Sequence, residues 1–356
     1  SNFWFAVQTG QYLKDTQTGY RLYPLKKLRG LSLLTSRYEA ELELMVFASW
    51  HGVKLVSEPV NVYYPPREER VSHFRPGKDF ARITVLNAVL CFLAVVYGLP
   101  LTVFRGLMTL LRTVYAIVFF MFTTFFMMTP LVHIYLLFGK ITEKKKYNLH
   151  RILNFMAKFV ICYHKIPGVR YTQKNNSGED FTKPAVIICN HQSHLDLAPL
   201  LALTPKVIVL TADWVWNNPV YRFTIRNAEF LPASSGVDAI MPQLRSLVER
   251  GYSIAVYPEG TRSLDCSLGR FRQGAFHVAR TLGVDILPVV IYGTGKALKK
   301  RGRLLRKWPV HMEIDRRITP EEMMSMGETT RQQASQMRKY YQKRYTEIAD
   351  RIEQDV

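Results

Sequence analysis

The most conspicuous pattern along the chain is a pair of long apolar runs near its middle. Residues 83–104 form a run of 22 without a charge, and residues 113–139 form a second uncharged run rich in Phe, Met, Leu and Val. Each run exceeds the roughly 20 residues that a helix needs to cross a bilayer. Residues 105–112, which carry two arginines, separate the runs. The pattern predicts two membrane helices within 83–139, folded back on each other as a hairpin.

Basic residues lie on both outer flanks of these runs, and by the positive-inside rule both ends of the hairpin then face the cytoplasm. The flanking cations are Arg75, Lys78, Arg82, Lys140, Lys144, Lys145, Lys146 and Arg151. Two other interpretations stay open. The runs can be buried in a soluble core, or they can form a re-entrant or interfacial pair kinked at Pro100 and Pro130.

Beyond residue 140, short apolar runs alternate with segments of helical period. Strands are predicted near 168–172, 184–189, 206–210, 253–257 and 286–291, and helices near 147–163, 195–203, 238–250 and 273–282. Strands that alternate with helices are typical of an α/β sheet with parallel strand pairs and flanking helices. We therefore predict an α/β domain over 140–320, followed by a polar C-terminal helix within 321–356.

The first 82 residues show a different order of elements. A polar loop around residues 14–24 precedes a predicted helix at 36–50, with Ser36 as N-cap and Gly52 as the stop signal. Residues 53–62 alternate and are rich in Val, which predicts a strand. The chain opens without Met or a signal peptide, and we expect it to be a fragment of a longer protein.

The charge of the chain restricts its partners. A formal net charge of +20 calls for an anionic partner such as a membrane surface, a phosphorylated lipid, an acidic carrier protein or nucleic acid. The membrane-grade apolar runs make nucleic acid the weakest of these, and none is expected. Residues 296–307 hold seven Lys or Arg in twelve positions. The four scattered cysteines suggest neither a disulfide framework nor a metal site, which favours a reducing, cytosol-facing setting.

Candidate chemistry follows the apolar run 185–189, where Asn190 begins a polar turn before the helix predicted at 195–203. His191 and Asp196 lie five residues apart in this turn. A carboxylate against one imidazole nitrogen fixes the tautomer and leaves the other nitrogen free as a general base. A metal site of His191, His194 and Asp196 has no further clustered ligand in its favour. No metal or cofactor is expected. His194 is interpreted as a surface residue or as one that supports the catalytic pair without contacting the substrate.

A second candidate block follows the strand predicted at 253–257. Gly260 permits close approach of the backbone to a ligand, and Arg262 can bind a phosphate through two parallel hydrogen bonds. Arg270 and Arg272 lie a few residues later and are candidates for a second phosphate contact or for solvated surface positions. The residues of the two blocks suit one kind of reaction, the transfer of an acyl group from a thioester to a hydroxyl. This reaction needs a base, a group that orients the base, and positive charge or N–H donors that stabilise the oxyanion. His191 can be the base and Asp196 the group that orients it.

The two blocks, in this order and spacing, resemble those of the glycerolipid acyltransferases. The resemblance covers about residues 140–315 and rests on His191 with Asp196, on the Pro-Glu-Gly-Thr-Arg-Ser block at 258–263, and on the Pro-containing strand 286–291. It implies that His191 and Asp196 are catalytic. It also implies that Glu259, Gly260, Thr261, Arg262 and Arg272 bind substrate, with the block around Arg262 on a phosphorylated acceptor. Residues 226–231 depart from a further block of that family.

Residues 1–82 resemble the last third of a GT-A glycosyltransferase of the dolichyl-phosphate-mannose-synthase type. The resemblance rests on the loop containing Asp15, Gly19 and Arg21, on the Glu-rich helix, and on the segment Glu58-Pro59-Val60. That family's Asp-x-Asp metal site would lie upstream, and this chain contains no such motif. We interpret the segment as a partial domain.

The leading hypothesis is a membrane-bound O-acyltransferase. Its acyl donor would be acyl-CoA or an acidic acyl-carrier protein, and its acceptor most simply a lysophospholipid such as 1-acylglycerol-3-phosphate. The active site would face the cytoplasm from the inner membrane, among membrane lipids. The alternatives are a bifunctional parent protein that also transfers a sugar to a lipid phosphate, and a non-catalytic membrane scaffold.

Overall fold

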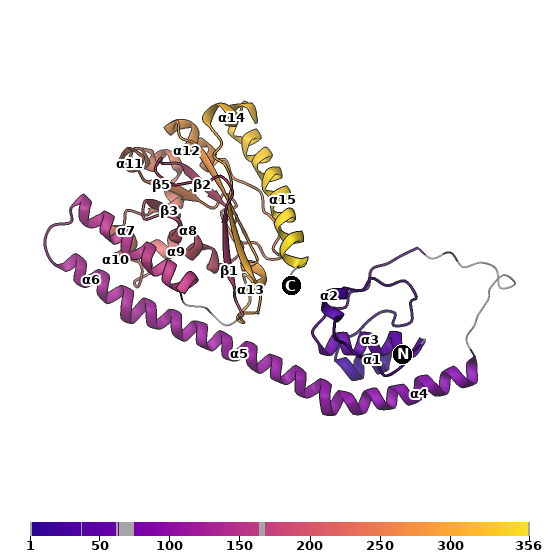
Figure 1. Ribbon diagram of the computed structural model, residues 1–356. Helices are drawn as coiled ribbons and strands as arrows, with labels where there is room; N and C mark the ends of the chain where they lie inside the picture. The colour runs from indigo at the N-terminus through magenta and orange to yellow at the C-terminus, as the bar shows by residue number, and fades with distance from the viewer. Residues whose placement is uncertain (1, 37, 62, 64–74, 164–167, 355–356) are drawn as a thin grey trace. The chain divides into compact units, whose positions relative to one another are not determined.

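The computed structural model describes residues 2–36, 38–61, 63, 75–163 and 168–354. The described chain forms two compact units, one up to Met108 and one from Thr109 to Asp355. The second unit contains a seven-stranded sheet and the helices that surround it, and Figure 1 shows this sheet with helix α15 running along it. This unit contains all the candidate site residues.

The sheet of the second unit has the strand order β1-β7-β6-β2-β5-β3-β4. Its strands are β1 (Tyr171–Asn175), β2 (Val186–Cys189), β3 (Val207–Thr211), β4 (Leu231–Pro232), β5 (Ser253–Val256), β6 (Ile286–Tyr292) and β7 (Val310–Ile314). All neighbours are parallel except β6 and β7. The predicted α/β sheet with parallel pairs is therefore confirmed. Two strands were not predicted. β4 has only two residues, and in β7 polar side chains, which are buried, alternate with apolar ones.

Helices accompany the strands as the alternation predicted. They are α7 (Glu143–Lys158), α8 (Leu197–Leu203), α9 (Asp213–Trp216), α10 (Arg222–Asn227), α11 (Val237–Glu249), α12 (Gly274–Leu282), α13 (Thr294–Ala297), α14 (Pro320–Ser325) and α15 (Thr330–Gln354). Every residue of β2 and β6 is buried, so the two strands lie at the centre of the core. When both faces of a sheet are buried, the sequences of its strands are continuous runs of apolar residues. Such runs made β2 and β6 easy to predict.

The predicted hairpin turn at residues 105–112 is wrong. Helical structure continues without a break from Pro76 to Leu137 through α4 (Pro76–Leu93), α5 (Leu99–Met121) and α6 (Thr129–Leu137), joined by π-helical Ala94–Gly98 and Phe122–Met128. Residues 105–112 are mostly good helix formers, and one glycine costs a helix only about 1 kcal/mol. The side chains of both arginines also have partners far along the chain: Arg105 donates to the Trp50 carbonyl at 2.8 Å, and Arg112 lies against Gly168.

Pro100 and Pro130 each follow one of the π-helical turns by two residues. A proline ring clashes with the carbonyl four residues before it and removes one backbone donor. A wider π turn at that place is a known way for a helix to accommodate such a defect. The prolines therefore change the local helical hydrogen bonding and do not end the helix.

The first unit has a small core of its own. α1 (Asn2–Thr9), α2 (Leu25–Leu28) and α3 (Tyr38–Trp50) are described in it, and Phe5, Val46 and Trp50 are buried together with Leu90 of α4. The predicted helix at 36–50 is confirmed, and Gly52 follows its end at φ +80°. The predicted strand at 53–62 is wrong for its described residues 53–61, which have no strand structure. An alternating segment becomes a strand only when another strand pairs with it.

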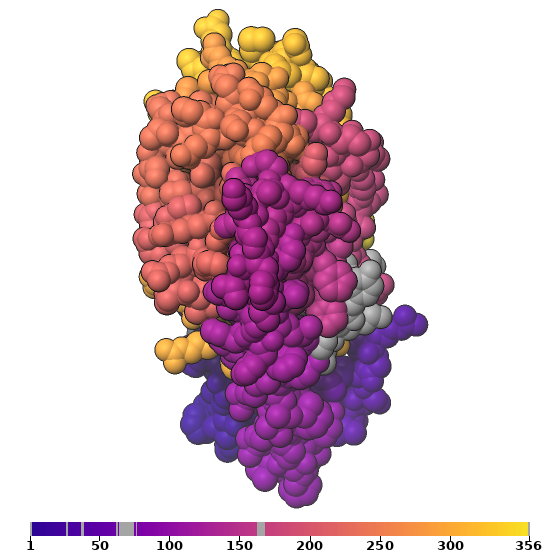
Figure 2. All heavy atoms as spheres, turned by 90° about the vertical axis from the view of Figure 1, so that its left-hand side faces the viewer, coloured from indigo at the N-terminus to yellow at the C-terminus, as the bar shows by residue number. Residues whose placement is uncertain are grey.

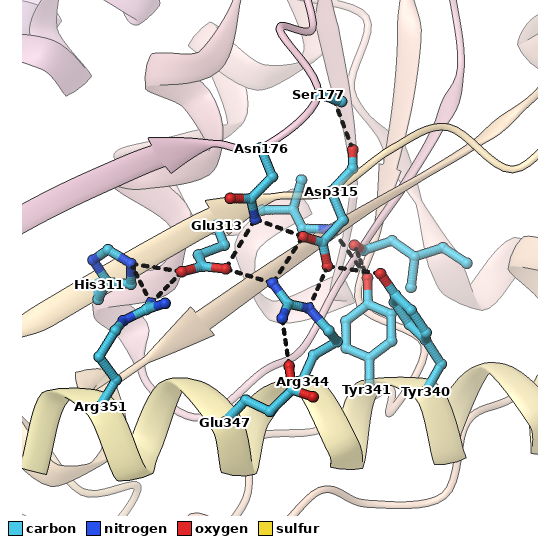
Figure 3. A network of polar contacts seen from close by, with 12 residues as sticks. Asn176, Ser177, His311, Glu313, Asp315, Tyr340, Tyr341, Arg344, Glu347 and Arg351 are labelled. Carbon is cyan, nitrogen blue, oxygen red and sulfur yellow. Dashed lines mark hydrogen bonds and ion pairs between the residues drawn. The ribbon is translucent and has the colours of Figure 1, made fainter.

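Helix α15 contacts strand β7 through a buried polar network, shown in Figure 3. Glu313 on β7 is fully buried and pairs with Arg344 and Arg351 of the helix. Asp315 also accepts from Arg344, at 3.0 Å, and from the Tyr340 hydroxyl at 2.8 Å. Burial raises the pKa of Glu313, but hydrogen bonds from Asn176, Arg351 and His311 outweigh this effect and lower the pKa to about 2.

This network predicts an acid-sensitive attachment of α15. The pKa of Glu313 is lower in the folded than in the unfolded chain, so its contribution to stability is complete above about pH 4.5 and is lost as the pH falls toward 2. The contribution is on the order of 3 kcal/mol. We expect the free energy of unfolding of the wild type to exceed that of Glu313→Gln at pH 6, and the difference to shrink at pH 3.

Urea titrations at several pH values measure this difference. The matched control is Glu347→Gln, because Glu347 also pairs with Arg344 but its side chain is 45% exposed. The control should change stability little at any pH. A Glu313→Gln penalty that is the same at pH 3 and pH 6 would contradict the assignment.

Candidate active site

The turn that carries His191 and Asp196 lies at the carboxyl end of β2, where β2 gives way to α8. Asn190 links this turn to β6, because its amide group donates to the Ile291 carbonyl and accepts from the Ile291 N–H, both at 2.8 Å. Ser193 and Asp196 form a capping box at the start of the following 3₁₀ turn. These bonds fix the backbone of the turn on both sides of His191.

His191 and Asp196 are in hydrogen-bond contact, as predicted. Nδ1 of His191 lies 2.9 Å from Oδ2 of Asp196, and the same oxygen accepts from the N–H groups of Gln192 and Ser193 at 2.7 and 2.9 Å. Asp196 is fully buried, whereas the side chain of His191 is 22% exposed. Because an ionised carboxylate only accepts hydrogen bonds, Nδ1 carries the proton and Nε2 presents its lone pair. The pair has the geometry of a base and its orienting acid.

The ring of Tyr257 packs against the face of the His191 imidazole. Its ring is stacked on that of His191, with centroids 4.1 Å apart and planes inclined by 20°. The contact restricts rotation of the imidazole, so the ring orientation is set by stacking as well as by Asp196. Sequence analysis did not assign this role to Tyr257, although it directly precedes the Pro-Glu-Gly-Thr-Arg-Ser block.

Glu259 lies at the junction of the two blocks. One carboxylate oxygen accepts from the N–H of His191 at 2.7 Å and the other from the N–H of Gly269 at 2.8 Å. Burial raises its pKa against the effect of these two hydrogen bonds. Since both oxygens are directed at backbone amides, the structure favours a role in positioning His191 over direct contact with an anionic substrate.

Gly260 has φ +67°, and a Cβ added there would lie 2.8 Å from the guanidinium of Arg272. The glycine is thus required for both the turn and the close approach of Arg272. The neighbouring Thr261 accepts from Lys300 Nζ at 2.9 Å. Lys300 belongs to the basic run of residues 296–307, so this run approaches the candidate site.

Arg262 lines an open pocket of about 1050 Å³ together with Thr261, Arg270 and Arg272. The N–H of the next residue, Ser263, donates to the carbonyl of His191 at 3.0 Å, so this end of the pocket adjoins the catalytic turn. Burial, and then the positive charge of Arg262, lower the pKa of His194 in the same turn. Lys300, Arg331 and Arg338 also line the pocket and were not predicted as site residues.

His194 makes no hydrogen bond with His191 or Asp196 in the described part of the chain. Its ring meets that of Trp214 edge-on, with centroids 6.0 Å apart, and Trp214 is exposed. No cluster of three or more His, Cys, Asp or Glu side chains suited to a metal is found within the described ranges.

Helix α15 contacts both the catalytic turn and strand β6. The Tyr345 hydroxyl donates to the Gln192 side chain at 3.0 Å, and the Tyr341 hydroxyl accepts from the Val289 N–H at 3.1 Å. Arg338 donates to the carbonyls of Leu268 and Gly269, and the Gly269 N–H in turn donates to Glu259. The helix that sequence analysis described only as polar therefore stabilises both blocks of the site.

The segment that holds the catalytic turn is similar to known acyltransferases. Residues 168–292 match the model of the Acyltransferase family. A 1-acyl-sn-glycerol-3-phosphate acyltransferase of Arabidopsis thaliana chloroplasts is 35% identical over 120 residues, which cover 32% of this chain and 33% of that protein. One from Chlamydomonas reinhardtii is 28% identical over 234 residues, 60% of this chain and 66% of that protein. The match thus spans about a third of the Arabidopsis relative's length.

A solved structure shares the fold. It is the 1-acyl-sn-glycerophosphate acyltransferase PlsC from Thermotoga maritima, with a TM-score of 0.56 at 19% identity, covering 69% of this chain and 98% of that one. Residues 168–292 therefore match an acyltransferase family, and the relatives similar to them are named as glycerolipid acyltransferases. The solved structure shows the fold that this part of the chain shares. Since the family match lies within residues 168–292, the glycosyltransferase resemblance of residues 1–82 stays a prediction.

Proposed function

We propose that the chain transfers an acyl group from a thioester to the hydroxyl of a lysophospholipid, most simply 1-acylglycerol-3-phosphate. The observation that carries the proposal is the His191–Asp196 pair next to a cation-lined pocket. The pair supplies a base for a hydroxyl, and the pocket supplies charge for a phosphate on the same acceptor. The relatives named 1-acyl-sn-glycerol-3-phosphate acyltransferase support this choice of acceptor.

The reaction needs no cofactor beyond its two substrates. The acceptor hydroxyl gives its proton to Nε2 of His191 as its oxygen attacks the thioester carbonyl carbon. The tetrahedral intermediate then collapses with cleavage of the C–S bond, and the imidazolium returns the proton to the leaving sulfur. The products are an ester and a free thiol. Asp196 stabilises the imidazolium without taking the proton itself.

Assays with a panel of acceptors test the proposal. The full chain in detergent or vesicles is incubated with labelled acyl-CoA and, separately, labelled acyl-carrier protein. Lysophosphatidic acid, lysophosphatidylcholine, glycerol 3-phosphate and a monoacylglycerol are compared as acceptors. Highest transfer to lysophosphatidic acid is expected. Equal transfer to the monoacylglycerol, which lacks phosphate, would contradict the phosphate assignment.

The chain is also proposed to bind the cytoplasmic surface of a membrane. The described chain contains one helical segment, Gly77–Leu137, long and apolar enough to span a bilayer. Within the second unit, large apolar side chains of this segment are exposed, Phe126 by 73% and Leu137 by 76%. Figure 2 shows the part of this helix that belongs to the second unit, from residue 109 on, on the outside of the α/β domain. Exposed apolar surface of this extent is typical of a membrane contact.

The contacts of the helix favour an orientation along the membrane plane. At one end Thr113 accepts from the Leu305 N–H at 2.9 Å, and at the other end Val132 and Leu136 are buried in the core of the α/β domain. A helix that contacts the domain at both ends cannot cross the bilayer perpendicularly without drawing the domain into it. We therefore favour the interfacial alternative for residues 113–137, with the apolar face in the lipid.

Changing Phe122 and Phe126 together to Gln is expected to lower vesicle binding. Burial of one such aromatic side chain contributes about 1.5–3 kcal/mol, so the partition coefficient should fall at least tenfold. Co-sedimentation with vesicles in high salt measures it. The control Met324→Gln, on exposed α14, should bind as the wild type does. Unchanged binding of the double variant would contradict the proposed membrane face.

A further inference from the structure

The pocket beside Arg262 carries more positive charge than one phosphate group requires. Its lining contains six cationic side chains: Arg262, Arg270, Arg272, Lys300, Arg331 and Arg338. Only two carboxylates line it, and both are engaged locally. Glu259 accepts from two backbone amides, and Asp265 accepts from Ser263 and Ser267. A phosphate monoester carries a charge of at most about −2 near neutral pH.

Four of these cations are available to a ligand. Arg338 donates to two backbone carbonyls and Lys300 to Thr261, so both have protein partners. The guanidinium groups of Arg262, Arg270, Arg272 and Arg331 make no hydrogen bond or ion pair with any other residue in the described part of the chain. Unpaired guanidinium groups that share a pocket repel one another, and a polyanionic ligand relieves this repulsion.

The cations that line the pocket come from two parts of the chain. Arg262 is next to the catalytic turn, because the N–H of the following residue donates to the His191 carbonyl. Arg331 belongs to helix α15, whose Arg338 donates to the Gly269 carbonyl directly before Arg270. At about 1050 Å³ the pocket is at the upper end of the range for small-molecule sites and has space for more than one phosphate.

We propose that the α15 side of this pocket, with Arg331 and Arg270, binds the nucleotide phosphates of a CoA thioester. This inference rests on the proposed function and adds the location and chemical class of its donor. The adenosine end of CoA carries a diphosphate and a 3′-phosphate. These groups can pair with the positive charges of the pocket that the single phosphate of the acceptor does not neutralise. Arg262 keeps the acceptor's phosphate next to His191. The concave form of the site suits this nucleotide better than the convex surface of an acidic carrier protein.

Binding of CoA and of adenosine 3′,5′-bisphosphate to the full chain tests the proposal without any turnover. Loss of one charge-assisted contact should weaken binding about tenfold or more, so Arg331→Ala is expected to raise the Kd of both compounds by that factor. Lys339→Ala is the matched control, because Lys339 is exposed on the same helix outside this pocket. An unchanged Kd for Arg331→Ala would overturn the assignment.

Turnover separates the donor from the acceptor. The wild type should use acyl-CoA with a lower KM than acyl-3′-dephospho-CoA, and Arg331→Ala should reduce this preference while leaving the KM for lysophosphatidic acid unchanged. A rise confined to the KM for lysophosphatidic acid or for acyl-carrier protein would refute the CoA site. If CoA binds as expected but no acyl group is transferred to any lysolipid, the proposed function fails while the CoA site stands.

Discussion

Replacing His191 with Ala is expected to lower kcat for acyl transfer by about 100- to 10,000-fold, the range that general-base catalysis contributes. The reason is the loss of the nitrogen that takes the hydroxyl proton. Asp196→Asn should cause a loss of similar kind, because an amide at that place no longer selects the tautomer with the proton on Nδ1. The KM values for both substrates should change much less than kcat.

His194→Ala is the matched control for this prediction. His194 lies in the same turn, but its ring contacts Trp214, and in the described chain it makes no hydrogen bond with His191 or Asp196. Its loss should change kcat by less than about twofold, well below the general-base range. The thermal midpoint of His191→Ala should stay close to that of the wild type, since this side chain is partly exposed. Wild-type turnover by His191→Ala would exclude the mechanism.

The second large effect is expected for Arg262→Ala, which should raise the KM for lysophosphatidic acid about tenfold or more. A charge-assisted hydrogen bond contributes roughly 1.5–3 kcal/mol, and Arg262 can make two of them to one phosphate. Arg262→Lys should restore only part of the affinity, because an ammonium group acts as a point charge. Initial rates at varied acceptor concentration measure the change.

Arg245→Ala controls for the loss of a surface guanidinium, since Arg245 is exposed on α11 outside the pocket. It should leave both KM values unchanged. A rise for Arg262→Ala in the donor's KM alone would instead place Arg262 on the donor, and the phosphorylated acceptor would lose its main support.

Local patterns in the sequence predicted most of the α/β domain and the core of the site. β2 and β6 are continuous apolar runs, and β5 is apolar after its first residue, Ser253; such runs are typical of strands in a sheet that is covered on both faces. His191 and Asp196 are five residues apart in one turn, so their contact depends mainly on local folding. The hydrogen bond at 2.9 Å confirms that expectation.

Features that depend on distant contacts escaped prediction. β7 contains His311 and Glu313, which are polar by type but buried because α15 supplies Arg344 and Arg351. Arg331 lines the pocket only because α15 packs beside the Arg270 loop, and no local pattern distinguishes it from other arginines of that helix. The hairpin turn predicted at 105–112 is absent from the structure, and distant contacts are again involved. Both flanking arginines have contacts in the folded chain that composition alone does not reveal.

The central claim is that His191 acts as the base in acyl transfer to lysophosphatidic acid, and product stoichiometry tests it most directly. The chain is supplied with labelled acyl-CoA and lysophosphatidic acid, and free thiol and phosphatidic acid are measured together. We expect equal amounts of both products from the wild type, and at least about 100-fold less of each from His191→Ala in the same time. Release of thiol without phosphatidic acid, or equal product from the variant, would contradict it.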